Sequence, residues 1–184
     1  MRFKIFATAF LTVTLFCYRS LATEPPPGEK AVPHQRISVH EYQNFIGNWD
    51  DKVNPVLCAL IKSPEQYNSV FHAAAVMHGK KLYAPDKELY AKEQIILVAK
   101  VMTAPTDMDK AFADATVTET GDTLMIHYRM NDAKSDATYT VKNFLALRIP
   151  KKDYKRVVFL EGEKQVAELK PSAGAWCNIK LEVQ

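Results

Sequence analysis

Alternation of apolar and polar residues with a period of two is the feature that most constrains the fold of this chain. From Thr123 to Met130, every second residue is Leu, Ile, Tyr or Met, and the residues between them are Thr, Met, His and Arg. Residues 141–149 alternate in the same way and end at Pro150. A period of two places successive side chains on opposite faces of a strand. We therefore predict strands that have one face in a core and one wetter face.

Turn signals connect these segments into hairpins. Thr120-Gly121-Asp122 separates residues 115–119 from 123–130, and a second turn with Gly162 separates 157–160 from 165–169. Short turns that contain Gly between apolar segments are typical of hairpins. Further strands are predicted at residues 56–61, 95–101 and 176–183. Because short turns join most neighbouring strands, we expect one largely antiparallel sheet of about seven strands.

One helix is predicted to pack on this sheet. Ser63 stands at a cap position and Pro64 at the first helical position, where the missing N–H of proline costs no hydrogen bond. The helix is expected to run to about Met77 and to stop at Gly79. Its apolar face comprises Tyr67, Val70, Phe71, Ala74 and Met77. The fold class is therefore α+β, while residues 37–49 fit either a strand or a short helix.

The first 22 residues have the pattern of a secretory signal peptide. Arg2 and Lys4 precede the uncharged run 5–16, and Ser20-Leu21-Ala22 supplies small residues for a cut between Ala22 and Thr23. The run is shorter than the ~20 residues that a membrane-spanning helix needs. We therefore expect an exported protein, periplasmic or extracellular, without a stable membrane span.

Two other interpretations of this N-terminal segment remain open. It is either an uncleaved anchor flanked by Arg19, or the signal of a lipoprotein modified at Cys17. Against the second, bulky Phe16 occupies the position where a lipoprotein signal needs a small residue. With cleavage, the chain divides into a signal peptide (1–22), a proline-rich solvated spacer (23–36) and a single domain (37–184).

Removing the signal peptide changes the charge of the chain. The full sequence has 24 Lys and Arg residues against 21 Asp and Glu residues, a net charge of +3. Arg2, Lys4 and Arg19 lie in the signal peptide, so the remaining chain has 21 basic and 21 acidic residues. Proteins that bind nucleic acid normally present a basic surface. We therefore expect no nucleic-acid partner.

Two cysteines remain after cleavage, Cys58 and Cys177. Both lie on the apolar side of predicted strands, and an oxidising compartment allows such residues to pair. A disulfide between them would close a loop of 119 residues and stabilise the fold by up to ~4–5 kcal/mol in the chain-entropy model. The alternative is two free thiols that pack as small apolar side chains.

No motif for catalysis, metal binding or a cofactor is present in the sequence. The five histidines lack the spacing of metal ligands on a helix, and the six glycines form no phosphate loop. No G-x-S-x-G nucleophile elbow occurs either. We therefore predict no catalytic, metal or cofactor residues. His127 and Arg129 share one strand face and form a candidate anion-binding surface, although a solvated sheet face explains them equally well.

A resemblance to a known family adds a partner to this description. Residues 86–99 place an acid, an aromatic residue and a Lys-Glu pair before an apolar strand, and 148–154 lead into a second strand at 157–159. This arrangement resembles the PrcB-type protease-complex subunit family over about residues 56–169. The resemblance implies an extracytoplasmic bacterial α+β module that associates with another protein, and it carries no catalytic residues. The chain otherwise resembles small secreted bacterial proteins of unknown function.

The function expected from the sequence is that of an exported, non-enzymatic module which binds a protein or polymer through a sheet face or an edge strand. The alternative is a small-ligand binder or hydrolase whose site is not visible in the sequence. Catalytic groups converge in space and not along the chain, so the lack of motifs does not remove that alternative.

Overall fold

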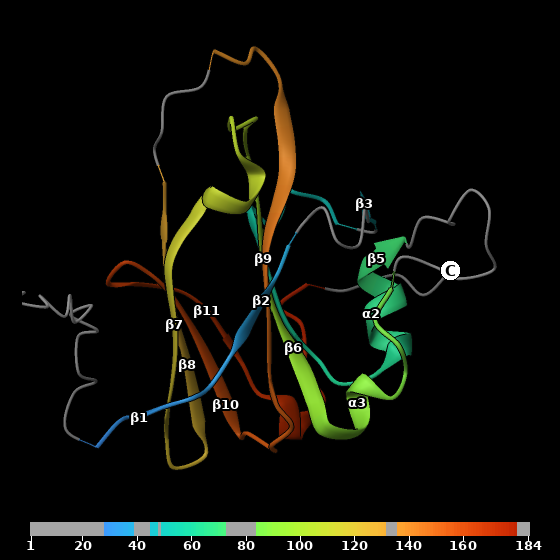
Figure 1. The fold of residues 1–184 in the computed structure, drawn as a ribbon, viewed down its shortest axis with the longest axis vertical. Coiled ribbons are helices and arrows are strands. Elements are labelled where there is room, and N and C mark those ends of the chain that lie inside the picture. The colour runs from blue at the N-terminus through green and yellow to red at the C-terminus, as the bar shows by residue number, and fades with distance from the viewer. Residues whose placement is uncertain (1–27, 39–44, 48, 73–83, 132–135, 180–184) are drawn as a thin grey trace, which may run out of the picture.

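A computed structural model describes residues 28–38, 45–47, 49–72, 84–131 and 136–179. Within these residues the fold is mostly β, with two main sheets, a two-stranded ribbon and one short helix of at least seven residues. Figure 1 shows the five-stranded sheet beside the four-stranded sheet, with the helices on the far side of the latter. The predicted signal peptide and its cut between Ala22 and Thr23 lie outside the described residues.

The larger sheet has the order β1-β7-β8-β10-β11. Its pairs are antiparallel except for β8 and β10, which run parallel. The strands are β1 (Lys30–Ala31), β7 (Phe112–Thr120), β8 (Thr123–Met130), β10 (Arg156–Glu161) and β11 (Lys164–Leu169). Gly121 (φ 58°) and Gly162 (φ 61°) stand in the two hairpin turns in the left-handed conformation that favours glycine. Both predicted hairpins are therefore confirmed.

The smaller sheet has the order β2-β9-β6-β4, and all its pairs are antiparallel. The strands are β2 (Gln35–Ile37), β4 (Val56–Ile61), β6 (Glu93–Thr103) and β9 (Thr140–Pro150). The ribbon pairs β3 (Phe45–Ile46) with β5 (Phe71–His72). The helical elements are α2 (Pro64–Val70), α3 (Leu89–Lys92), η1 (Met108–Lys110) and η2 (Pro171–Ala173).

The expectation of one sheet is wrong, because the chain alternates between two sheets. After β8 it enters the smaller sheet as β9 and then returns to the larger sheet as β10. This excursion brings β10 back parallel to β8. Alternation shows which side chains share a face of a strand, but it carries no information on which sheet the strand joins. The structure retains the mostly antiparallel pairing within each sheet.

The inner faces of the two sheets form the inter-sheet core. Both sheets contribute fully or nearly fully buried side chains, and each large one contributes roughly 1.5–3 kcal/mol relative to exposure. The smaller sheet supplies Cys58, Leu60, Ile96, Val98, Leu145 and Leu147, and the larger supplies Val117, Leu124, Ile126, Tyr128, Val157 and Phe159.

The other face of the smaller sheet carries the helix-side core. Here α2, α3 and the β3–β5 ribbon cover residues such as Leu57, Ala59 and Leu97. Strands β4 and β6 are consequently buried on both faces, which explains why their sequences read as continuous apolar runs rather than as alternation.

The predicted helix begins as expected and ends early. The Ser63 hydroxyl accepts a hydrogen bond from the Gln66 N–H at 3.3 Å, and Pro64 is the first helical residue. The helix stops at Val70 and not at Met77, because Phe71 turns to an extended conformation and pairs with Ile46. Its ring packs between Tyr67 (4.7 Å between centroids) and Phe144 (5.2 Å). The position of the predicted residues Ala74 and Met77 lies outside the described residues.

Part of the predicted spacer belongs to the sheets. Residues 30–31 form β1 on the larger sheet and residues 35–37 form β2 on the smaller sheet. Between them Val32 is only 6% exposed and its N–H donates to the Val117 carbonyl at 2.8 Å. We name residues 30–37 the N-terminal crossover. Within the described parts of the ambiguous segment 37–49, Ile37 belongs to β2 and residues 45–46 form β3, while residues 38, 47 and 49 lie outside helices and strands.

The predicted C-terminal strand appears as a short strap. Within its described part, residues 176–179, Cys177 forms an isolated antiparallel bridge with Ala59 on the edge of β4. The Leu60 N–H donates to the Trp176 carbonyl at 2.8 Å, and the Asn178 N–H donates to the Cys58 carbonyl at 3.1 Å. We name residues 175–179 the C-terminal strap.

Candidate functional site

Among the described residues, one face of the larger sheet belongs to neither core. On β8 the odd-numbered residues point away from Leu124 and Ile126, which are in the inter-sheet core, and the same holds for the even-numbered residues of β10. We call this side the outer face. Its central residues, aligned by the registers of β7, β8 and β10, are Thr116, Thr118, Met125, His127, Val158 and Leu160.

The centre of the outer face combines an apolar group, Met125, Val158 and Leu160, with the polar residues Thr116, Thr118 and His127. Met125 lies opposite Val158, and His127 lies opposite Leu160. Val158 is only 8% exposed, while Met125, His127 and Leu160 are partly buried. Among the described residues, neither the inter-sheet core nor the helix-side core includes Met125, Val158 or Leu160.

Ion pairs border this centre on two sides. The Arg156 guanidinium donates to both oxygens of Glu168, at 3.2 and 3.0 Å. That hydrogen bonding holds the pKa of Glu168 below its usual value and raises the pKa of Arg156. On the other side Arg129 Nη2 lies 3.1 Å from Asp114 Oδ2. The outer face therefore has an apolar group at its centre and a charged but locally neutral border.

His127 and Arg129, the anion site considered from the sequence, do share the outer face. The Arg129 charge is directed at the Asp114 carboxylate, which stands at a bulge in β7 and has a positive φ of 48°. An incoming anion would have to displace this carboxylate. The geometry therefore favours a sheet face with a paired arginine over an anion site.

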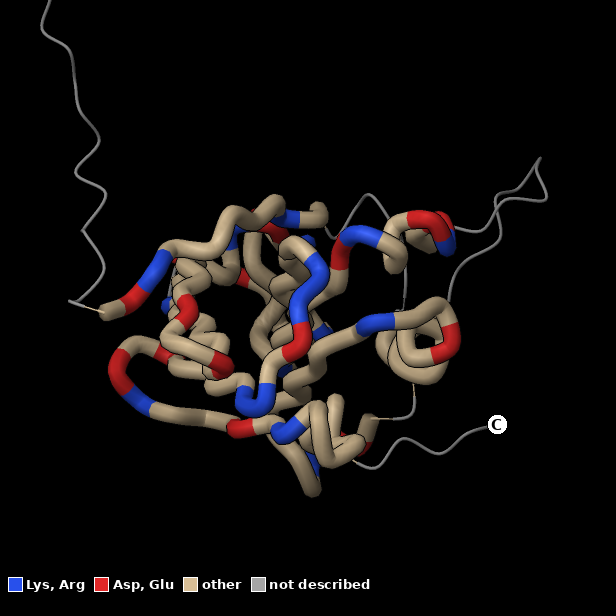
Figure 2. The backbone as a smooth tube through the Cα atoms, turned by 90° about the horizontal axis from the view of Figure 1, so that it is seen from below, with Lys and Arg blue, Asp and Glu red and all other residues tan. Residues whose placement is uncertain are grey.

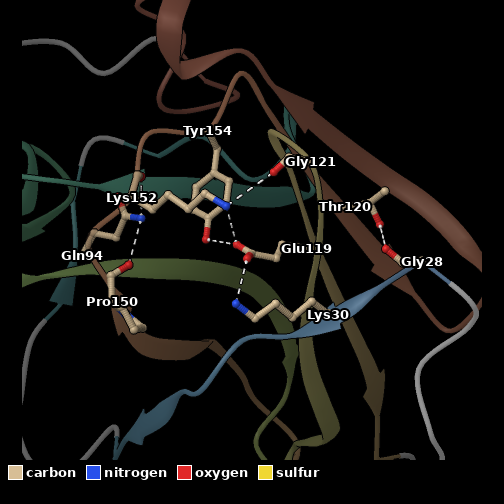
Figure 3. A network of polar contacts seen from close by, with 9 residues as sticks. All are labelled: Gly28, Lys30, Gln94, Glu119, Thr120, Gly121, Pro150, Lys152 and Tyr154. Atoms are coloured by element: carbon tan, nitrogen blue, oxygen red, sulfur yellow. Dashed lines mark hydrogen bonds and ion pairs between the residues drawn. The ribbon is translucent and has the colours of Figure 1, made fainter.

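A first polar network lies at the end of the larger sheet near the turn after β7 (Figure 3). Glu119 Oε2 accepts hydrogen bonds from Lys152 Nζ at 2.9 Å and from the Tyr154 hydroxyl at 3.0 Å. Lys30 Nζ lies 3.9 Å from the other oxygen. The hydrogen bond from Lys152, together with those positive charges, lowers the pKa of Glu119. The network joins β1, β7 and the segment after β9.

The Gln94 side chain forms hydrogen bonds with the backbone of residues 150–152, at and just after the end of β9. Its Nε2 donates to the Lys152 carbonyl at 3.0 Å and to the Pro150 carbonyl at 3.4 Å (Figure 3). Lys152 Nζ also lies 5.3 Å from the centre of the Tyr154 ring. The buried Gln94 Oε1 has no hydrogen-bond partner among the described residues. The other contacts of the network all fix the chain, so we interpret it as structural.

A second polar network connects the two sheets through the inter-sheet core. Lys100 Nζ donates to both oxygens of Glu161 at 2.9 Å, and the Tyr128 hydroxyl donates to Glu161 Oε2 at 3.3 Å. Burial is the main cause that raises the pKa of Tyr128, and the Cys58 thiol and Glu161 raise it further. Through these contacts Glu161 cross-links β10 of the larger sheet to β6 of the smaller sheet.

The two cysteines are unbonded in the structure. Cys177 is bridged to Ala59, the neighbour of Cys58, and adjacent residues of a strand point to opposite faces. Cys58 therefore lies in the inter-sheet core, while Cys177 packs against the helix-side core. Burial raises the pKa of both thiols, that of Cys177 to about 11. Pairing would require a one-residue shift of the strap, and the disulfide stays a prediction for thiol titration to test.

Three further properties of the described residues are metal-ligand clusters, membrane-spanning helices and the distribution of charge. These ranges contain no group of three or more His, Cys, Asp or Glu side chains placed to hold a metal ion. No helix in the described part of the chain is both long and apolar enough to cross a membrane. Figure 2 shows Lys and Arg positions interspersed with Asp and Glu positions along the described chain.

Comparison of the chain with protein families, curated proteins and solved structures finds no match in any of the three. The resemblance to PrcB-type subunits therefore stays a prediction from its motifs. The sequence did not identify the two polar networks, because the hydrogen bonds to Glu119 and Glu161 come from residues 33 to 61 positions away. The outer face was detectable only as the polar side of the alternating pattern at 123–130.

Proposed function

We propose that this protein is an exported, non-enzymatic module that binds another protein through the outer face of its larger sheet. The observation that carries the proposal is the apolar group of Met125, Val158 and Leu160, which neither core includes among the described residues. Among the described residues the smaller sheet is covered on both faces, whereas the larger sheet is covered on one face only.

The composition of the outer face supports a protein partner. Protein interfaces commonly have an apolar centre surrounded by a polar rim. Here the rim is formed by the pairs Arg156–Glu168 and Arg129–Asp114. The apolar part of such a centre is supplied here by Met125 and Leu160, which are partly buried, and by Val158. The partner should accordingly present apolar side chains at its centre and polar groups around them.

Charge balance supports the same conclusion. Without residues 1–22 the chain has equal numbers of acidic and basic residues, and both signs are interspersed along the described chain (Figure 2). A partner selected by one sign of charge would favour a surface of the opposite sign. The resemblance to a family whose members associate with another protein points in the same direction.

Photo-crosslinking in cells of the native host would test the binding surface. A photoreactive amino acid at Leu160 should give a discrete crosslinked product with one protein, because this side chain lies in the apolar group of the outer face. The matched control is Val53, which is 71% exposed and precedes β4 of the other sheet. Equal products from both positions, or none from Leu160, would contradict the proposed surface.

The predicted export has its own test. Intact-mass measurement of the protein purified from the envelope or the medium should give a chain that begins at Thr23. A product that retains residues 1–22, or that carries lipid on Cys17, would contradict cleavage after Ala22.

A further inference from the structure

Strand β4 is an edge strand with the sequence of an interior one. All residues from Leu57 to Ile61 have 0% exposure, and their side chains alternate between the two cores. Edge strands usually carry charges, proline or bulges that prevent another strand from adding to them. This segment, LCALI, has none of these features. What protects its edge in the structure is the C-terminal strap.

The strap covers this edge with few contacts. Its described pairing is the single bridge from Cys177 to Ala59 and two main-chain hydrogen bonds, at Leu60 and Cys58. By comparison, the other edge of β4 pairs with β6 over six residues. Segments held by few hydrogen bonds open locally at a much lower free energy than the core.

The Asn178 side chain replaces main-chain groups that a longer strand would supply. Its Oδ1 accepts from the Cys58 N–H at 2.8 Å, and its Nδ2 donates to the Val56 carbonyl at 2.9 Å. A peptide amide has the same pair of groups, one acceptor and one donor. The edge of β4 therefore already makes the hydrogen bonds that an added strand would make. Over the first half of β4, the Asn178 side chain makes part of them.

The start of the strap provides a hinge. Gly174 has φ 82° and ends η2, and a bridge between Lys170 and Ala175 closes the turn. Rotation at this glycine would release residues 176–178 without disturbing β11. The side chains of Trp176, Cys177 and Ile179 would then leave the helix-side core, against which they are partly buried.

We propose that the C-terminal strap is a displaceable cover, and that the edge of β4 receives an extended apolar strand of a partner protein in its place. The incoming strand runs antiparallel to β4, as the strap does, and places small or apolar side chains against the helix-side core. Strand addition of this kind gains its affinity from main-chain hydrogen bonds. This surface is separate from the outer face and does not depend on it.

An engineered disulfide that fixes the strap on β4 reversibly tests the proposal. In the full chain carrying Cys17→Ser, Cys58→Ala and Ala59→Cys, oxidation should join residue 59 to Cys177 and fix the strap on β4. Directly opposed residues in an antiparallel pair have Cα atoms ~4.5–5.5 Å apart, within the range that a disulfide spans. A non-reducing gel distinguishes a bond within one chain from a bond between two chains.

The probe is a fluorescent peptide with the sequence of residues 175–184 in which Cys177 is replaced by Ala, so that no thiol exchanges with the disulfide. The readout is its anisotropy. The reduced protein should bind the peptide, and oxidation should abolish the binding. Asn178→Ala in the protein should increase the affinity about tenfold, because the strap of the protein then competes less well. Leu160→Glu on the outer face should leave peptide binding unchanged, which separates this test from that of the proposed function.

Three results would overturn the proposal. The first is equal peptide binding by the reduced and oxidised forms. The second is an Asn178→Ala variant that binds no better than the protein with its native strap. The third is an oxidised product bonded mainly between two chains, which would assign the strap to exchange between copies of this protein.

Discussion

The two lateral sides of the sandwich are both closed by a segment that passes from the larger sheet to the smaller one, and the two closures differ in strength. The N-terminal crossover pairs with β7 through β1 and with β9 through β2. The C-terminal segment leaves β11, forms η2 and reaches β4 through one bridged residue. In Figure 1 the first closure runs from β1 to β2, and the second starts at β11.

The two closures also differ in how deeply their side chains are buried. In the N-terminal crossover, Val32 inserts into the inter-sheet core and Arg36 Nη1 donates to the Phe112 carbonyl on the other sheet at 2.7 Å. Burial lowers the pKa of Arg36, and Asp109 and Asp107 oppose that shift. In the strap, by contrast, Trp176, Cys177 and Ile179 are only partly buried. We therefore call the N-terminal crossover the permanent closure of the sandwich and the C-terminal strap its reversible closure.

The largest effect is expected where the permanent closure enters the core. Val32→Asp places a carboxylate in the inter-sheet core without a cationic partner, and we expect it to lower the free energy of unfolding by about 3–5 kcal/mol. The matched control is Ala31→Asp, at an exposed position of β1, which should cost less than about 1 kcal/mol. Urea unfolding followed by tryptophan fluorescence measures both. Similar losses would mean that residue 32 contributes little to closure.

The second effect concerns the reactivity of the two thiols. In the native protein carrying Cys17→Ser, iodoacetamide should modify Cys177 at least about 100-fold faster than Cys58, because opening of the strap suffices for Cys177. Cys58 has 0% exposure and requires loss of the inter-sheet core. Peptide mass mapping over time gives both rates. Equal rates would show that the strap opens only when the whole domain unfolds.

The pH dependence of these thiols follows from their raised pKa values. The pKa of Cys177 rises from the ordinary 9.0 to about 11 on folding. The folded state therefore binds the thiol proton more tightly, and this stabilisation is complete below about pH 9 and is lost as the pH rises towards 11. The raised pKa of Tyr128 acts in the same direction. Stability should consequently fall in alkali, and the fall should be smaller in Cys177→Ala.

Much of the strand content could be predicted from the sequence because it depends on local rules. Glycine turns and period-two alternation located the hairpin at 120–122 and that at 161–164, and apolar continuity located β4 and β6. The division into two sheets could not be predicted, since β9 alternates like its neighbours in sequence but pairs elsewhere. Similarly, Phe71 fits the helical pattern, and only its pairing with Ile46 shows that the helix has ended.

The candidate surface was predictable only in part. Alternation placed Met125, His127 and Arg129 on one strand face, but the apolar neighbours Val158 and Leu160 come from a strand that pairs parallel with β8. A parallel partner cannot be derived from hairpin signals, which describe antiparallel neighbours. The role of residues 30–37 was missed for a related reason. The prolines at 25–27 and 33 indicated a spacer over residues 23–36, whereas the short segments beside Pro33 pair with two different sheets.

A smaller effect is expected in the reversible closure. Asn178→Ala removes two hydrogen bonds from the edge of β4, to Cys58 and Val56, and should cost about 1–2 kcal/mol. Because the strap opens locally, the change should appear mainly as faster hydrogen exchange at the Cys58 amide. Asn178→Asp is the matched control, since its carboxylate still accepts from that amide but no longer donates to Val56. An unchanged exchange rate in Asn178→Ala would mean that the side chain does not hold the strap.

The smallest effect concerns Glu119, which connects the start of the permanent closure to the segment after β9 through Lys30, Lys152 and Tyr154. Glu119→Gln removes the charge and keeps an acceptor, and we expect a loss of about 1 kcal/mol at neutral pH, as for other partly exposed ion pairs. The matched control is Glu163→Gln in the exposed turn between β10 and β11, which should change the free energy of unfolding by less than about 0.5 kcal/mol.

The difference in stability between the native protein and Glu119→Gln should disappear at acidic pH. The hydrogen bond from Lys152 lowers the pKa of Glu119 in the folded state, so its stabilisation is present above the ordinary value of 4.5 and is lost as the pH falls through the lowered one. The native protein and Glu119→Gln should therefore converge in stability at low pH and separate as the pH rises. Hydrogen exchange at the Val32 amide should follow the same course, because Lys30 precedes it by two residues in the N-terminal crossover. If the difference in stability between the two proteins is instead the same at every pH, the carboxylate charge does not contribute to this closure. Its strand pairing, the Arg36 hydrogen bond and the burial of Val32 then distinguish it from the strap.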